Sequence, residues 1–311
     1  MTKSGTTIKA LASLVFALSL CSTAQAQSRV FVSGLGSDAN PCSRTAPCRT
    51  FQQAHNVVAA AGEVVVLDAA GYGQVTITKS VNIIGDGVYA GVTVPSGDGI
   101  TINSATAVVA LRNLTINGLG SGTNGINVTS VGTLHVEGCV ISGFTGRGIL
   151  ISLSADGSHI FIKDTITRNN GNDGISILTI TGTVRASIDN CRSEGNGSNG
   201  FFAAQNSLVT INRSVASGNV NVGFFALSSG SGPTVELSCE ECVSSNNGSG
   251  FRVNTLSGGA ATIRVSHSTA TNNTNFGFAQ LSAGVFKSLV NNLVDGNGTD
   301  TSGTITVIAL Q

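Results

Sequence analysis

Apolar and polar residues alternate in short segments that recur along most of the chain, and a glycine opens each segment. In Ile100-Thr-Ile102 and Ile175-Ser-Ile177 the apolar residues are two apart, which places them on one face of an extended strand. The pattern predicts a repeat that contains a half-buried strand. The opening glycines are spaced 23 to 27 residues apart: Gly99, Gly125, Gly148, Gly174, Gly200, Gly223, Gly250 and Gly277.

A second alternating segment follows inside each repeat, and a polar turn with an asparagine closes it. Ile160 with Ile162 and Ile263 with Val265 are examples of this second strand. No repeat shows a helical period, and the period is too short for a β-propeller blade of roughly 40 residues. Strands that bury only one face are satisfied by stacking coil on coil at about 4.8 Å. We expect about nine coils over residues 63–297, with residues 298–311 as a last strand or a closing flap.

The segment before the repeats, residues 27–62, is predicted to cap the stack. Residues 29–33 alternate as a strand, and a loop with two prolines and two cysteines follows. Thr50 and Gln53 have the spacing of a helix capping box, an apolar stripe follows, and Gly62 is expected to end the helix. A short capping helix over the first coil would cover its open backbone edge.

These features together resemble the right-handed parallel β-helix of the pectin-lyase-like superfamily, over the whole mature chain. Residues 32–51 contain Val-Ser-Gly-x-Gly-Ser-Asp-x-Asn-Pro followed by Pro-Cys-x-Thr-Phe, which is similar to the opening segment of many exported bacterial β-helix proteins. The resemblance implies an all-β, single-domain solenoid. It also implies that the ligand, if there is one, is a polysaccharide.

The first 26 residues have the three parts of a secretory signal peptide. Lys3 and Lys9 form a cationic region, an apolar stretch follows, and Ala24-Gln-Ala26 is a cleavage site of small residues. The apolar stretch is too short to span a bilayer, and no later segment reaches the required ~20 apolar residues. We expect cleavage after Ala26 and a secreted or periplasmic protein without a membrane span.

The charge of the chain argues against nucleic acid as a partner. Sixteen basic residues balance 16 acidic ones, and charged residues make up only 10% of the chain. Removal of the signal peptide also removes two lysines and leaves the mature chain slightly acidic. The basic face that binding to a phosphate backbone requires is therefore not expected.

Six of the seven cysteines remain after processing, in a compartment where disulfides form. Cys42 and Cys48 enclose a short loop and are the best candidates for a bridge. Cys239 and Cys242 would lie at a corner of one coil, where a second bridge could close. In contrast, Cys139, Cys191 and Cys242 share one column at every second coil, roughly 10 Å apart. That distance is beyond disulfide reach, so the column is expected to hold small buried residues.

The sharpest catalytic hypothesis comes from the residues that precede the repeat glycines. Successive coils present Asp98, Asn124, Arg147, Asp173 and Asn199 in this column. Stacking would bring Arg147 close to Asp173. A calcium-assisted lyase needs carboxylates for the cation and a basic group for the uronate proton, so Asp98, Arg147 and Asp173 are the candidate catalytic residues. The alternative is a structural ladder of salt bridges and amides. No Asp-Asp pair or Gly-His-Gly motif is present, and glycoside hydrolysis is therefore less expected than lysis.

A second stripe comes from the outward position of the same strands. Phe202 and Phe225 would stand one above the other on the exterior, with Arg252 on the next coil. Aromatic rings beside an arginine can bind sugar rings, pack under the C-terminal flap, or form a contact between two copies of the protein. The sequence leaves these three alternatives open.

The overall expectation is an exported β-helix protein that binds polysaccharide through a lateral strand face or serves as a structural surface protein. The alternative function is a polysaccharide lyase acting on a uronate-containing glycan, and calcium is expected as a cofactor only in that case. No other metal or cofactor site is expected. A metal site of this kind needs two His or Cys pairs at ligand spacing, and the sequence does not contain two such pairs.

Overall fold

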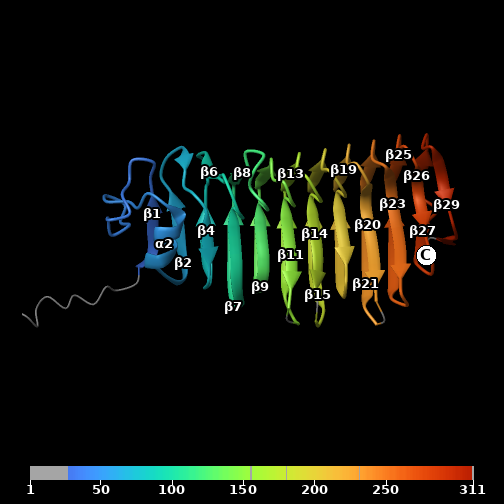
Figure 1. Ribbon diagram of the computed structural model, residues 1–311, viewed down its shortest axis with the longest axis horizontal. Helices are drawn as coiled ribbons and strands as arrows, with labels where there is room; N and C mark the ends of the chain where they lie inside the picture. Colours follow the sequence, from blue (N-terminus) through green and yellow to red (C-terminus); the bar gives the residue numbers. More distant parts are fainter. Residues whose placement is uncertain (1–26, 155, 180, 231, 310–311) are drawn as a thin grey trace, which may run out of the picture.

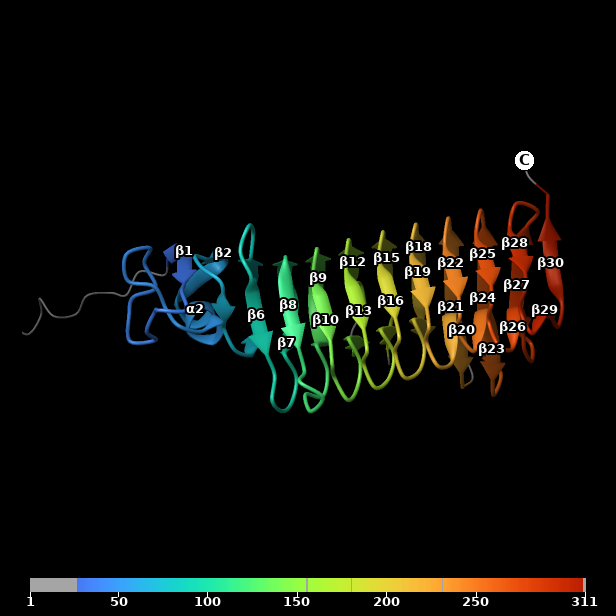
Figure 2. The same cartoon turned by 90° about the horizontal axis from the view of Figure 1, so that it is seen from above.

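The computed structural model describes residues 27–309 except 155, 180 and 231, so the predicted signal peptide, residues 1–26, lies outside the described residues. The chain winds into a straight rod of about nine turns, with one short helix at the N-terminal end and the C-terminus at the other end (Figure 1, Figure 2). The predicted all-β right-handed parallel β-helix solenoid with a short N-terminal capping helix is confirmed. No helix of the described residues is long and apolar enough to cross a membrane.

Each turn contributes one strand to each of three lateral faces, and every strand pair is parallel. Face 1 contains the eight strands at the repeat glycines, with β4 before the first of them and β29 after the last. In chain order its members are β4 (Val75–Ile77), the first parts of β7 (Ile100–Arg112) and β9 (Ile126–Glu137), β11 (Ile149–Leu153), β14 (Ile175–Thr179), β17 (Phe201–Ala204), β20 (Val222–Ser229), β23 (Ser249–Leu256), β26 (Phe276–Gln280) and β29 (Thr299–Ser302).

Face 2 contains the second strand of each repeat: β1 (Gln27–Val32), β2 (Val58–Val66), β5 (Val81–Ile84), the second parts of β7 and β9, β12 (His159–Lys163), β15 (Val184–Asp189), β18 (Ser207–Asn212), β21 (Thr234–Glu240), β24 (Ala260–Ser266), β27 (Val285–Leu289) and β30 (Ile305–Ile308). Faces 1 and 2 form one 20-stranded sheet because β7 and β9 run through the bend between them.

Face 3 is a separate 10-stranded sheet of short strands. Its members are β3 (Ala70–Gly71), β6 (Ala90–Thr93), β8 (Leu114–Asn117), β10 (Val140–Ser142), β13 (Ile166–Arg168), β16 (Arg192–Glu194), β19 (Val215–Ser217), β22 (Val243–Ser245), β25 (Thr269–Thr271) and β28 (Leu293–Asp295). The sequence pattern identified two strands in each coil, and face 3 supplies a third.

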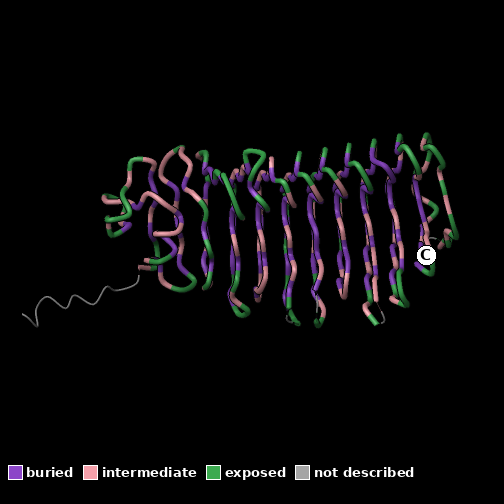
Figure 3. Tube along the Cα trace, in the orientation of Figure 1, coloured by how far each residue is buried: buried purple, intermediate pink, exposed green. Residues whose placement is uncertain are grey.

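Buried residues recur at the same positions of successive coils (Figure 3), and they form columns of identical or similar side chains inside the rod. The apolar residue after each repeat glycine points inward, and the isoleucines of the first coils give way to four phenylalanines. The rings of Phe201, Phe224 and Phe251 stack with centroids 4.9 and 4.8 Å apart, close to the strand spacing. The glycine itself is required by close packing: a Cβ on Gly200 would lie 2.7 Å from the carbonyl oxygen of Gly223 in the next coil.

Buried asparagines form a second interior column, at the end of face 3. The side-chain amide of Asn196 donates to Asn219 over 2.9 Å, and that of Asn219 donates to Asn247 over 2.9 Å. The positive φ angles of these turns belong to the residue before each asparagine of the column, for example Gly195, Gly218, Asn246 and Asn272. The column therefore satisfies buried backbone groups along the rod.

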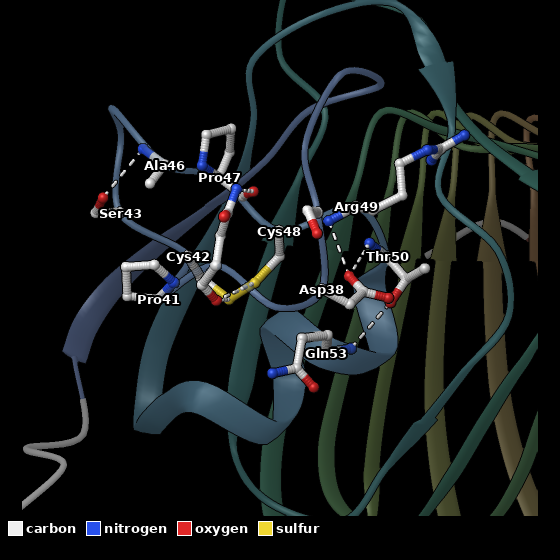
Figure 4. Close-up of a disulfide and its surroundings, with 12 residues drawn as sticks. Asp38, Pro41, Cys42, Ser43, Ala46, Pro47, Cys48, Arg49, Thr50 and Gln53 are labelled. Atoms are coloured by element: carbon white, nitrogen blue, oxygen red, sulfur yellow. Dashed lines mark hydrogen bonds between the residues drawn. A yellow bond between two sulfur atoms is a disulfide. The ribbon is translucent and has the colours of Figure 1, made fainter.

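The N-terminal cap is held by a disulfide and by a carboxylate (Figure 4). Cys42 and Cys48 form the predicted disulfide, with their Cα atoms 4.6 Å apart. Asp38 accepts hydrogen bonds from the backbone N–H groups of Arg49 and Thr50 and from the Thr50 hydroxyl. Thr50 in turn caps helix α2 (Phe51–Val57) by accepting from the backbone N–H of Gln53. Loop and helix are thereby fixed to each other.

Helix α2 ends at Val57, earlier than the predicted stop at Gly62. Val58 already has extended dihedral angles and begins β2, which pairs with β1. Adjacent β-branched residues favour a strand at this point. Gly62 has a different role from the one predicted, because a Cβ there would lie 2.6 Å from the carbonyl oxygen of Ser28. It allows β2 to approach β1.

One other sequence expectation needs correction. Cys239 and Cys242 are free, buried thiols, so the second disulfide is not formed in the structure. The Cys242 thiol donates instead to the carbonyl oxygens of Ile211 and Glu240.

Of the two alternatives for the C-terminal segment, a strand and a flap, the structure has the strand. β29 pairs with β26, and β30 pairs with β27, so this segment continues the solenoid.

Cys139 and Cys191 are free and buried as well, as the column argument predicted. The intervening coil places Thr165 between them, and its hydroxyl accepts from the backbone N–H of Cys139. Burial raises the pKa of both thiols to about 12. They are therefore protonated, unreactive packing residues at neutral pH.

Candidate functional site

The residues that precede the repeat glycines form a hydrogen-bonded ladder at the edge of face 1. Arg147 and Asp173 lie on neighbouring coils, directly before β11 and β14. The Arg147 Nε donates to Asp173 Oδ2 over 3.2 Å and to the Ser176 hydroxyl over 3.1 Å. The stacking of the two residues that the sequence predicted is therefore confirmed.

The Asp173 carboxylate is occupied on both oxygens. Oδ2 accepts from Arg147 and from the Ser176 hydroxyl, the latter over 2.6 Å. Oδ1 accepts from the backbone N–H and the side-chain amide of Asn199 on the next coil, over 3.0 and 2.8 Å. Only 3% of the Asp173 side chain is exposed. A buried carboxylate with four donors has no free lone pair directed at solvent, so it holds the coils together and is poorly placed to bind a cation, the role predicted for it.

Asp98 does not join this cluster. It precedes β7, three coils from Asp173, which corresponds to about 14 Å at the strand spacing. Its two oxygens accept from the side-chain amides of Asn124 and Asn127 over 2.8 and 2.6 Å. The three predicted catalytic residues are therefore spread along the rod instead of gathered around one substrate atom.

A calcium ion does not fit this ladder. Calcium takes six to eight oxygen ligands, and here the two carboxylates are separated and already bound to donors. Across residues 27–309, apart from the three undescribed positions, no group of three or more His, Cys, Asp or Glu side chains is arranged to hold a metal ion. No step of a calcium-assisted reaction can be built on these residues.

The outward stripe of face 1 forms a continuous stack in the middle of the rod. Phe202 in β17 and Phe225 in β20 lie one above the other, with ring centroids 5.5 Å apart and planes inclined by 35°. The Arg252 guanidinium in β23 lies over the Phe225 ring, 5.0 Å from its centroid. The three predicted binding residues are thus in contact, and we name them the aromatic stack.

Apolar side chains flank the aromatic stack in the neighbouring outward row. Leu178, Ala204 and Leu227 follow one another on β14, β17 and β20, and Ala204 is almost fully covered by its larger neighbours. The C-terminal strand β29 lies three coils beyond Phe225 and does not cover the stack. Of the three alternatives for these aromatic residues, packing under a C-terminal flap is therefore wrong.

Two polar atoms beside the aromatic stack lack hydrogen-bond partners. The Arg252 Nε and the Asn254 Oδ1 are buried and unpaired among the described residues, and both side chains point outward from β23. Arg252 also forms no ion pair with any carboxylate in the described part of the chain. Burial lowers the pKa of the Arg252 guanidinium, which nevertheless stays charged at neutral pH. One donor, one acceptor and one uncompensated charge therefore lie unpaired at one end of the stack.

The sequence analysis placed Asn199 in the ladder column but did not single out Ser176 and Asn254 as members of these two clusters. Ser176 and Asn254 occupy outward positions of the alternating strands, so their position marked both as surface-facing. What the sequence could not show is which neighbour each would contact, because that depends on the register between coils and on side-chain conformation.

Comparison with known proteins assigns the class of this protein. The family model described as right handed beta helix region matches residues 65–239 and 124–297, and the chain belongs to this family. No curated protein sequence matches the chain.

Solved structures show the same fold at low sequence identity. The A-module of the mannuronan C-5 epimerase AlgE6 of Azotobacter vinelandii is 15% identical, with a TM-score of 0.51 over 80% of this chain and 91% of that chain. The A-module of AlgE4 from the same organism is 16% identical, with a TM-score of 0.50 over 79% of this chain and 88% of that chain. The pectate lyase Pel9A is 13% identical, with a TM-score of 0.48 over 86% and 79%. At this level of sequence identity, the two epimerase modules show that this chain has the same fold, and they do not show that it has the same activity.

Proposed function

We propose that this protein is an exported β-helix protein that binds a carboxylate-bearing polysaccharide on face 1 without cleaving it. The aromatic stack is the platform for the sugar rings. Aromatic faces pack against the apolar faces of sugar rings, and two rings on adjacent coils offer a surface longer than one sugar residue. Polysaccharide-acting proteins with this fold support a glycan as the ligand class.

The observation that carries the proposal is the pair of unsatisfied polar atoms next to the stack. Sugar hydroxyls both donate and accept, so a glycan that displaces the long Arg252 side chain can satisfy both the Arg252 Nε and the Asn254 Oδ1. A ligand carboxylate compensates the desolvated charge of Arg252. A purely apolar partner surface does neither.

Binding without cleavage is supported by the ladder around Asp173. Its carboxylate oxygens are bound by Arg147, Ser176 and Asn199, and no described cluster of acidic side chains can hold calcium. The lyase alternative therefore lacks a cation site at the residues it named, and Arg147, the basic group it named, is held by Asp173 and Ser176.

Export is part of the proposal. The signal-peptide pattern at residues 1–26, with cleavage after Ala26, supports secretion or transfer to the periplasm. The disulfide between Cys42 and Cys48 agrees with an oxidising compartment. Detection of a mature N-terminus at Gln27 by mass spectrometry of exported protein tests this point, and an intact Met1 terminus in the cytoplasm contradicts it.

Equilibrium binding to alginate and polygalacturonate oligosaccharides tests the function. We expect the double variant Phe202→Ala, Phe225→Ala to bind at least about tenfold more weakly than the wild type. Val108→Ala is the matched control, because Val108 is an exposed apolar residue on face 2. Equal affinity of the double variant and the wild type would overturn the proposal. A second result would also overturn it. In that result no glycan binds, and sedimentation equilibrium shows a dimer of the wild type but a monomer of the double variant.

A further inference from the structure

Three shallow depressions adjoin one another on the outer surface of face 2, away from the aromatic stack. The central one has a volume of about 280 Å³, and its neighbours have about 240 and 180 Å³. Adjacent depressions share lining residues: Phe161 and Ser187 belong to two of them, and Thr210 and Ser238 belong to another two. They therefore form one trough that crosses strands β9, β12, β15, β18, β21 and β24, about 24 Å at the strand spacing.

The floor of the trough is lined by hydroxyl groups. Ser187, Thr210 and Ser238 are paired neighbours on β15, β18 and β21, and all three point outward. Their hydroxyls make no hydrogen bond to another residue within the described structure, so they are free to bond to a ligand. Each hydroxyl can donate one bond and accept two. The floor thus repeats the same polar group once per coil.

One end of the trough carries an aromatic platform. The rings of His135 and Phe161 stack with centroids 4.9 Å apart and planes inclined by only 15°. Phe161 is 40% exposed, which is unusual for a phenylalanine. A nearly parallel, half-exposed pair of flat rings beside a hydroxyl floor is a surface that matches both faces of a sugar: its apolar ring face and its hydroxyl edge.

Each of the four carboxylates around the trough has a basic side chain as its partner. Glu236 lies 2.8 Å from Arg264, and Glu137 lies 3.0 Å from Arg112. The remaining two acidic rim residues also have basic partners: Asp189 pairs with Arg213, and Glu240 pairs with His267. Arg185, which also lines the central depression, has no ion-pair partner among the described residues. The lining nevertheless holds three basic and four acidic side chains, so the trough as a whole presents no strong field of either sign. A neutral ligand is therefore a better match than a polyanion.

The backbone excludes one competing mode of binding. The N–H and C=O groups of β15, β18 and β21 are used in pairing between coils, and only the two ends of the rod expose strand edges. A peptide cannot add to this face as a further strand. Recognition here has to use side chains, and the side chains offered are hydroxyls and two stacked rings.

We propose that the face 2 trough binds a neutral linear glycan that lies along the rod axis. The strand spacing of about 4.8 Å is similar to the length of one sugar residue in an extended chain, so each coil meets one residue. Phe161 and His135 stack with a ring at one end, and the hydroxyls of Ser187, Thr210 and Ser238 bond to successive residues. This site is on a different face from the aromatic stack and does not depend on it.

Tryptophan fluorescence can test the site directly, because the chain contains no Trp. The variant Phe161→Trp places a single reporter in the trough, and Phe225→Trp places one in the aromatic stack. The probes are cellohexaose and mannohexaose as neutral glycans and hexagalacturonate as the acidic counterpart. We expect a saturable change in Phe161→Trp emission with at least one neutral hexasaccharide, and less than about a twofold change in Kd as salt is raised.

A blocking substitution provides the control. Thr210→Arg on the Phe161→Trp background covers the floor and is expected to weaken binding about tenfold. Thr262→Arg is the same substitution at an outward position of face 2 that does not line the trough, and it is expected to leave Kd within about twofold. An equal effect of both substitutions would overturn the assignment of the floor.

The outcomes separate this site from the function proposed for face 1. Emission changes in Phe225→Trp alone, with uronate oligosaccharides, would overturn the trough and support the aromatic stack. Emission changes in Phe161→Trp alone would support the trough and overturn the stack. Binding of only hexagalacturonate in the trough would overturn its assignment to a neutral ligand.

Discussion

Arg147 and Asp173, 26 residues apart in the sequence, face each other across one coil spacing with Nε and Oδ2 3.2 Å apart. The Asp173 side chain is almost fully buried, whereas 31% of the Arg147 side chain is exposed. With Ser176 and Asn199 they form a closed set of hydrogen bonds that links three successive coils. The pair therefore stabilises the edge of face 1.

Replacement of Asp173 should be costly for stability. In Asp173→Ala the Arg147 charge and two Asn199 donors lose their partner, and removal of one member of a buried pair costs about 3 kcal/mol. We expect this decrease in the free energy of unfolding from urea denaturation. Asp295→Ala, at an exposed position, should change it by less than about 0.5 kcal/mol. Equal stabilities of the two variants would contradict the structural role of Asp173.

The asparagine column should be equally sensitive in its centre. In Asn219→Ala the buried backbone N–H of Asn196 and the amide of Asn247 lose hydrogen bonds, a loss that we expect to cost about 2 kcal/mol or more. Asn221→Ala, two residues away and exposed, is the matched control. Thermal unfolding followed by circular dichroism compares the two, and a melting temperature of Asn219→Ala at or above that of Asn221→Ala would count against the column.

His55 should make the cap sensitive to acid. Its Nε2 accepts from the backbone N–H of Thr78 over 3.2 Å, so the neutral ring carries its proton on Nδ1, which is buried without a partner. Burial and the nearby Lys79 lower the pKa of His55 from 6.5 to about 4. The unfolded chain therefore binds more protons than the folded chain between these values, and the free energy of unfolding falls as the pH drops from 6.5 towards 4.

The variant His55→Gln isolates this contribution, because it keeps an acceptor for Thr78 and removes the titrating group. We expect the stability of His55→Gln to fall less between pH 7 and pH 4.5 than that of the wild type. His159→Gln, at an exposed position, should behave as the wild type does. Parallel pH profiles for His55→Gln and the wild type would show that His55 does not cause the acid sensitivity.

The sequence predicted those parts of the structure that depend on periodicity. The spacing of the repeat glycines placed Ile175 and Phe201 in one interior column and Phe202 and Phe225 in one exterior column, and the strand register agrees. It also placed Arg147 beside Asp173, because a column of residues at a fixed offset from the glycine must stack. Periodicity transfers directly to space in a solenoid.

Features that depend on local competition were not predictable in the same way. Helix α2 ends at Val57 instead of near Gly62 because Val58 begins β2 and pairs with Gln27 of β1. This contact between distant parts of the chain outweighs the local helix propensity. The trough on face 2 was missed because Ser187, Thr210 and Ser238 look unremarkable one by one. They become a surface only when three coils are placed side by side.

The central claim is that the protein binds a polysaccharide on face 1 and leaves it intact. The most direct measurement is the chain-length distribution of alginate and polygalacturonate, before and after incubation with the wild-type protein, by size-exclusion chromatography with light scattering, with calcium present. The account predicts a complex of protein and polysaccharide and an unchanged length of the polysaccharide once the protein is removed. The account would be contradicted if the wild type shortens the polysaccharide and the Asp173→Ala variant, while still folded, does not.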